Sequence, residues 1–175
     1  MPKKTLVTLT VVFGVMWLAS NIYMQAGFAA RERDGVEMAG DIAQFAIPAA
    51  GFAASFITGD FVGAGQFALG CLANLGVVTV IKQTVDAPRP NGKPHSFPSG
   101  HTAFAFHGAL FIQRRYGWRY GVAAMLVAGF VAFSRVDAGM HYVRDVVAGA
   151  AIGAAAGLVF TRSLQKGMGS GKAVK

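Results

Sequence analysis

Apolar runs separated by short polar connections constrain this chain more than any other feature of its sequence. Six runs follow one another, at residues 5–30, 42–58, 61–81, 99–112, 121–133 and 146–160. Hydrophobic residues make up 54% of the 175 residues and charged residues only 14%, which lies outside the usual range of soluble domains. A helix of about 20 apolar residues can span a bilayer. We therefore predict an all-α, integral membrane six-helix bundle, with residues 1–175 forming a single domain.

The distribution of charge predicts how such a bundle is oriented. Six spans place both termini on one side of the membrane, and the first run is too long for the core of a cleaved signal peptide. If the termini are cytoplasmic, Asp60 is the only acid among the inner connections and tails, whereas cations and acids balance on the outer side. The positive-inside rule favours this orientation. We predict a bacterial inner membrane protein with cytoplasmic termini. The net charge of +8 then reflects topology, and no nucleic acid partner is expected.

A first polar cluster, residues 82–101, lies between the third and fourth apolar runs. It contains the cations Lys82, Arg89 and Lys93, and it ends in Ser-Gly-His (residues 99–101), which opens the next predicted helix. Cations beside the free backbone N–H groups of a helix N-terminus form an anion site, and phosphate is often bound in this way. The prediction is a phosphate site at the outer face of the membrane.

A second polar cluster, residues 134–145, lies on the same predicted face. His141 and Asp145 are four residues apart, a spacing that places them together on one face of a helix. A carboxylate in that position can hold an imidazole in one tautomer. With His101 from the first cluster, the face offers two histidines, and phosphoryl transfer needs a nucleophile and an acid. These patterns leave open which histidine is the nucleophile. No carboxylate cluster suited to magnesium is present, and no cofactor is expected.

The two clusters resemble the three signature motifs of the type-2 phosphatidic acid phosphatase superfamily. Residues 82–90 fit K-x6-R-P, residues 98–101 fit P-S-G-H, and residues 134–145 fit S-R-x5-H-x3-D. All three match without a gap, in the family's order, and they are separated by apolar segments. The resemblance implies a membrane lipid phosphatase with a six-helix core and no metal.

The resemblance also implies a role for each motif residue. His141 is expected to attack phosphorus and form a phosphohistidine, with Asp145 orienting it. His101 is expected to protonate the leaving oxygen and later to activate water. The groups expected to hold the phosphate oxygens are Lys82, Arg89, Ser99, the Gly100 backbone N–H and Arg135. Lys93, His95 and Arg144 lie near these motifs but outside their defined positions.

Several substrates and two other functions are compatible with these patterns. The expected partners are membrane lipids and a lipid phosphate or diphosphate, such as undecaprenyl diphosphate, phosphatidylglycerophosphate, phosphatidic acid or lipid A phosphate. Vanadate-dependent haloperoxidases share the motifs, but they are soluble and larger. A non-catalytic lipid-binding membrane protein is the remaining alternative, and the intact His141, His101 and Asp145 argue against it. The oligomeric state is left open.

Glycines recur every four residues in the last apolar run, at Gly149, Gly153 and Gly157. A stripe of small residues lets two helix backbones approach closely. We expect this stripe to pack against another helix of the same chain rather than to form a dimer. His107, in the middle of the fourth run, is expected to be an internally hydrogen-bonded packing residue.

Overall fold

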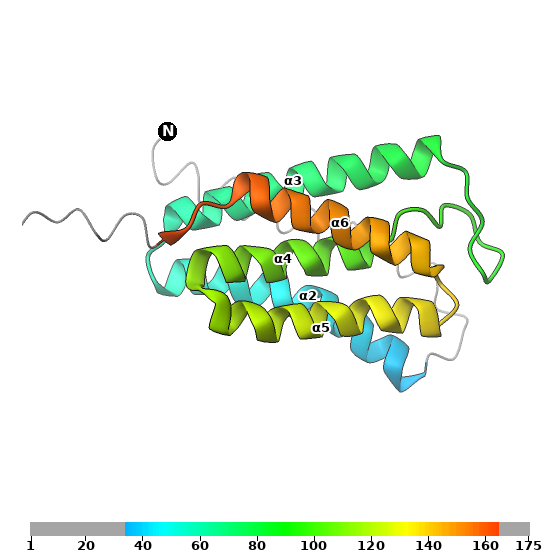
Figure 1. The fold of residues 1–175 in the computed structure, drawn as a ribbon, viewed down its shortest axis with the longest axis horizontal. Helices are drawn as coiled ribbons and strands as arrows, with labels where there is room; N and C mark the ends of the chain where they lie inside the picture. The colour runs from blue at the N-terminus through cyan, green and yellow to red at the C-terminus, as the bar shows by residue number, and fades with distance from the viewer. Residues whose placement is uncertain (1–33, 165–175) are drawn as a thin grey trace, which may run out of the picture.

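The computed structural model describes residues 34–164, which form five α-helices that run up and down (Figure 1). The helices are α2 (Gly35–Ile57), α3 (Phe61–Thr84), α4 (Gly100–Tyr116), α5 (Trp118–Asp137) and α6 (Val143–Phe160). The described residues contain no strand, as the all-α prediction requires. The predicted first span, residues 5–30, lies outside the described residues. The expectation of a sixth helix therefore stays a prediction.

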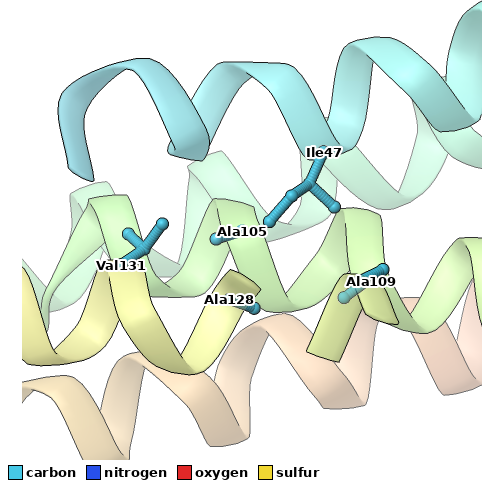
Figure 2. Packing of buried hydrophobic residues seen from close by; sticks show 6 residues of the cluster. Ile47, Ala105, Ala109, Ala128 and Val131 are labelled. Atoms are coloured by element: carbon cyan, nitrogen blue, oxygen red, sulfur yellow. The ribbon is translucent and has the colours of Figure 1, made fainter. Parts of the chain in front are cut away.

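Helix α4 lies at the centre of the bundle and contacts each of the other four helices (Figure 1). It begins where the Ser99 side chain accepts a hydrogen bond from the Thr102 N–H at 3.4 Å, as an N-cap serine does. The face of α4 toward α2 and α5 carries small residues, and Figure 2 shows Ala105 and Ala109 packing among residues of these two helices. Small side chains let the neighbouring helices approach closely. The motif at the start of α4 is thus anchored in the interior of the fold.

The glycine stripe of α6 packs against α4 of the same chain, as the sequence predicted. A Cβ atom added at Gly149 would lie 2.4 Å from the Ser99 carbonyl oxygen, and one added at Gly153 would lie 2.0 Å from that of Ala103. Real Cβ atoms do not approach so closely. The two backbones are therefore in contact only because α6 has no side chains there. This contact fixes the start of α6, with Asp145, beside the start of α4.

Four of the described helices, α2, α3, α5 and α6, are long and apolar enough to cross a membrane. Many of their large apolar side chains are exposed, among them Leu69, Val80, Leu126 and Val159. Exposed apolar surface of this extent is expected when the solvent is lipid. The chain is an integral membrane protein.

The helices are longer than the apolar runs, and the largest shift of a boundary is at the start of α2. The second apolar run begins at residue 42, but α2 begins at Gly35. Asp34 caps this helix by accepting a hydrogen bond from the Glu37 N–H at 2.7 Å, which overrides the polar character of the first two turns. The connection between the fourth and fifth apolar runs is also shorter than the runs suggest. It consists of Gly117 alone, which turns the chain at φ 103°.

Both polar clusters lie at the same end of the bundle (Figure 1). The loop between α3 and α4, the turn between α5 and α6, and the N-terminus of α2 meet there. The turns between α2 and α3 and between α4 and α5 lie at the opposite end. The fold therefore brings together segments that are some 50 to 100 residues apart in sequence.

Candidate active site

Asp145 joins the two polar clusters. Its carboxylate oxygen Oδ2 accepts hydrogen bonds from the Ser96 hydroxyl and, at 2.9 Å, from the Tyr142 N–H. Its carbonyl oxygen accepts the Ser99 N–H at 2.9 Å. The side chain is fully buried, so its orientation is set by these partners. The sequence placed Asp145 beside His141, but it gave no signal for Ser96, which comes from the other cluster.

His141 lies in the turn before α6, and its Nδ1 atom is 3.6 Å from Oδ2 of Asp145. The sequence predicted this pair on one helix face, which is wrong in detail, because α6 begins only at Val143. The position of His141 is set instead by its N–H, which donates to the Arg135 carbonyl at 3.1 Å. Within residues 34–164, Nδ1 has no hydrogen-bond partner. The Asp145 carboxylate would form a hydrogen bond with Nδ1, and so orient the imidazole, if the two atoms came slightly closer.

The surroundings of His141 keep its imidazole neutral. Burial lowers the pKa of His141 far below its usual value, and the positive charges of Arg89 and Lys82 lower it further. Contact with the Ser96 backbone opposes these effects only weakly. A neutral imidazole has a free lone pair at neutral pH, which a nucleophile or a general base requires.

Two cations of the first cluster face this centre. Lys82 donates from Nζ to the carbonyl oxygens of His95, at 2.7 Å, and Ser96, at 3.4 Å. Arg89 lies with Nη1 3.9 Å from the sulfur of Met140. Burial lowers the pKa of Arg89, while the negative charge of Asp145 raises it. The two side chains concentrate positive charge next to His141, where an anion would be stabilised.

The start of α4 supplies two more of the predicted anion-binding groups, Ser99 and the Gly100 N–H. Gly100 is the first residue of the helix, so its N–H has no partner within the helix. Ser99 is fully buried, and its hydroxyl oxygen accepts from the Thr102 hydroxyl at 3.0 Å. A helix N-terminus attracts negative charge. The predicted phosphate-binding groups thus surround the same end of α4.

Arg135, at the end of α5, is held by groups that the sequence did not indicate. Its guanidinium donates to the Asp41 carboxylate at 2.6 Å, to the Glu37 carbonyl at 2.7 Å and to the Ser134 hydroxyl at 3.2 Å. The same Asp41 oxygen lies 3.4 Å from Nε2 of His101. Asp41 and Glu37 both precede the second apolar run, which begins at residue 42. Their spacing of four residues, after the helix-starting pattern at Asp34, is the only local sign that they share a helix face.

The other polar residues near the motifs are more exposed. Arg144 is exposed, with Nε 3.6 Å from Asp145 and its guanidinium over the Tyr142 ring. His95 and Lys93 lie on the exposed part of the loop between α3 and α4.

Among residues 34–164 there is no group of three or more His, Cys, Asp or Glu that could hold a metal ion. His107 is buried, with Nε2 3.3 Å from the Phe67 carbonyl oxygen, which confirms its packing role.

Comparisons with known proteins identify related chains. A lipid A 4'-phosphatase of Helicobacter pylori is 30% identical in an alignment of 138 residues that covers 72% of this chain and 69% of that protein. A lipid A 1-phosphatase of Porphyromonas gingivalis is 41% identical over 90 residues, or 49% of this chain, and the match spans only 20% of that longer protein. The crystal structure of Aquifex aeolicus LpxE has the same fold, with a TM-score of 0.58 at 24% identity over 68% of this chain and 83% of that one.

A family model extends the likeness across most of the bundle. The model of the PAP2 superfamily matches residues 63–168. That range begins in α3 and includes all of α4, α5 and α6, together with both polar clusters. The chain belongs to the PAP2 superfamily.

Proposed function

We propose that this protein is a membrane lipid phosphatase that removes a phosphate group from a lipid at the end of the bundle where the polar clusters meet. The observation that carries this proposal is Asp145, which holds residues of both clusters around one point. His141, Lys82 and Arg89 lie around this carboxylate, and His101 lies two residues beyond Ser99, which bonds to its carbonyl. A nucleophile, cations and helix N–H groups around one point are the parts that phosphoryl transfer requires.

In the first step of the proposed mechanism, the neutral imidazole of His141 attacks phosphorus and the bond to the lipid oxygen breaks. His101 donates a proton to that leaving oxygen. The product is a phosphohistidine, and the charge on its oxygens is stabilised by Lys82, Arg89 and the N-terminus of α4. Asp145 stabilises the positive charge that develops on His141.

In the second step, water hydrolyses the phosphohistidine. His101, now neutral, takes a proton from the attacking water, the bond from nitrogen to phosphorus breaks, and inorganic phosphate leaves. The proton that His101 takes from water in this step replaces the proton that it gave to the lipid oxygen in the first step. The cycle needs no group beyond the side chains and backbone N–H groups at this end of the bundle.

Lipid A is the substrate that the comparisons favour, because two of the relatives are lipid A phosphatases. Phosphatidic acid, phosphatidylglycerophosphate and undecaprenyl diphosphate are the alternatives compatible with the family. All four present a phosphate at a membrane surface. The polar end of the bundle lies beside exposed apolar helix faces, so a lipid can present its phosphate there without leaving the bilayer.

Phosphate release from purified protein tests this function. Lipid A, phosphatidic acid, phosphatidylglycerophosphate and undecaprenyl diphosphate are supplied in detergent micelles with EDTA present. We expect phosphate release from lipid A, and loss of release in His141→Ala. A matched control is Gly76→Ala, because a Cβ atom at Gly76 meets nothing within 4 Å. Equal release by the wild type and His141→Ala, or no release from any of the lipids, would contradict the proposal.

We further propose that this end of the bundle faces the periplasm of a bacterial inner membrane, with the termini in the cytoplasm. The only cysteine in the sequence, Cys71, is buried, so introduced thiols can be labelled against a low background. An Asp86→Cys thiol, in the loop between α3 and α4, is expected to react with a membrane-impermeant maleimide in spheroplasts. A Thr58→Cys thiol, at the opposite end, is expected to react only after lysis. The reverse pattern would overturn the orientation.

A further inference from the structure

Asp41 of α2 contacts two residues of the candidate active site at once. Its Oδ1 atom lies 2.6 Å from Nη1 of Arg135 and 3.4 Å from Nε2 of His101. Arg135 belongs to α5 and His101 to α4, so one carboxylate oxygen joins three helices. None of the three signature motifs includes Asp41. We propose that Asp41 is a positioning residue, anchored by Arg135, that orients the imidazole of His101.

The anchor at Arg135 is rigid. The guanidinium is buried and also donates to the Glu37 carbonyl and the Ser134 hydroxyl. A buried cation needs a paired anion, because an uncompensated buried charge is strongly destabilising. Asp41 supplies that charge, and its side chain is only 12% exposed. The carboxylate is therefore held in place whether or not His101 is protonated.

The close approach of α2 to this pair is built into the helix. A Cβ atom added at Gly40 would lie 1.9 Å from the Ser134 hydroxyl oxygen and 2.7 Å from Nη2 of Arg135. Only glycine fits there without a shift of α2 or of these side chains. The neighbouring residue Asp41 can reach both partners because position 40 carries no side chain.

The contact with Asp41 determines which nitrogen of His101 can donate a proton. A carboxylate at Nε2 leaves Nδ1 as the nitrogen that can donate a proton to a leaving oxygen. Burial lowers the pKa of His101 most, the hydrogen bond to Asp41 opposes that effect, and the charges of Arg135 and Arg89 lower the pKa further. These groups come from α2, α5 and the loop between α3 and α4, and His141 lies close enough for the two imidazoles to influence each other. Asp41 is thus the group that opposes the loss of the His101 proton, and removing it should lower the pKa of His101 further.

The test compares Asp41→Asn with Asp34→Asn, and it rests on the proposed phosphatase function. Both substitutions remove one carboxylate from the first turns of α2. Asparagine caps helices as well as aspartate does, so Asp34→Asn keeps the start of α2. Activity is measured from pH 5 to 9 with an alkyl lipid phosphate and with 4-nitrophenyl phosphate, whose leaving group needs little protonation. Wild type and His141→Ala are measured alongside, so that a failure of the phosphatase function itself is seen separately.

For Asp41→Asn we expect kcat with the lipid substrate at pH 8 to fall about 10- to 100-fold, the range seen when the carboxylate that orients a metal-binding histidine is removed. The alkaline limb of the pH profile should move to lower pH by about 1 unit, because His101 loses its stabilising anion. The loss with 4-nitrophenyl phosphate should be several-fold smaller. Asp34→Asn should match the wild type within about twofold.

Two results would overturn the inference. One is a pH profile for Asp41→Asn that matches Asp34→Asn. The other is a loss of equal size at every pH and with both substrates, which would mean that Asp41 supports only the fold. If Asp41→Asn does not fold, Asp41→Glu carries the test, since it keeps the charge beside Arg135. The alkaline limb of the Asp41→Glu pH profile should lie at lower pH than that of the wild type. An alkaline limb at the wild-type pH would also overturn the inference.

Discussion

The Nδ1 atom of His141 lies 3.6 Å from the Oδ2 atom of Asp145, although the two residues belong to different elements. His141 is in the turn after α5, and Asp145 is in the first turn of α6. The same Oδ2 atom is held by the Ser96 hydroxyl and the Tyr142 N–H. The Ser96 hydroxyl and the Tyr142 N–H therefore fix the Asp145 carboxylate independently of His141, and the imidazole lies beside it.

Asp145→Asn tests this placement. The amide can still accept the Tyr142 N–H, but it carries no charge to stabilise a positive His141. We expect kcat to fall about 10⁴-fold, the scale seen when a carboxylate that orients a catalytic histidine is replaced by an amide. The matched control is Asp137→Asn, because Asp137 is exposed at the end of α5. Similar kcat values for the two variants would rule out the orienting role.

Ser96→Ala tests a contact that the sequence did not indicate. The substitution removes the hydroxyl that bonds to Asp145, so we expect kcat to fall about 10-fold and stability to fall by about 1 kcal/mol. Ser55→Ala is the control, because Ser55 is also buried and bonds to Tyr116 at the opposite end. It should lose stability without losing kcat. If the two variants have the same kcat per folded molecule, Ser96 does not act through Asp145.

Arg89→Gln tests the electrostatics of His141. Burial and then the charge of Arg89 lower the pKa of His141, so removing that charge should raise the pKa. Protonated His141 cannot attack, and the acid limb of kcat/KM should move to higher pH. KM should also rise, because a predicted phosphate-binding cation is lost.

The control for Arg89→Gln is Lys93→Gln, which removes a positive charge from the same loop. Lys93 is not among the groups that shift the pKa of His141, so the acid limb should stay in place. An acid limb that does not move in Arg89→Gln, or that moves equally in both variants, would argue against the predicted influence of Arg89.

Gly153→Ala tests the contact between α4 and α6. The added Cβ would lie 2.0 Å from the Ala103 carbonyl oxygen, and neither backbone can move without displacing its helix. We expect a loss of about 1–3 kcal/mol, the usual cost of overpacking, seen as a lower thermal midpoint in detergent. Gly76→Ala, at an open helical position, should be neutral or should raise stability by about 0.5–1 kcal/mol. A Gly153→Ala protein as stable as Gly76→Ala would show that the contact is not tight.

The sequence could predict the parts of the fold and of the site that depend on local patterns. Apolar runs indicated the helices α3 to α6, and the glycine spacing indicated the close packing of α6. The pairing of His141 with Asp145 followed from their separation of four residues, although the turn before α6 brings them together in a different way. Each of these relationships involves residues close together in the chain or a regular period.

The contacts of Asp41 and Ser96 could not be predicted, because each depends on how distant segments meet. Asp41 is 94 residues from Arg135, and Ser96 is 49 residues from Asp145. No local pattern distinguishes an aspartate that pairs with a buried arginine from one exposed at a membrane surface. The start of α2 was a different case, since Asp34 and Glu37 form a helix-starting pattern that the surrounding charges obscured.

The most direct test of the proposed chemistry is to locate the phosphate on the enzyme during turnover. His101→Ala protein is mixed with 4-nitrophenyl phosphate, which can form the intermediate without an acid but needs His101 for hydrolysis. The protein is then digested under alkaline conditions, which preserve phosphohistidine, and analysed by mass spectrometry. The prediction is phosphate on His141 in the His101→Ala protein and none in the doubly substituted His101→Ala, His141→Ala protein. Phosphate on another residue, or turnover by a protein that lacks His141, would contradict the assignment of His141 as the nucleophile.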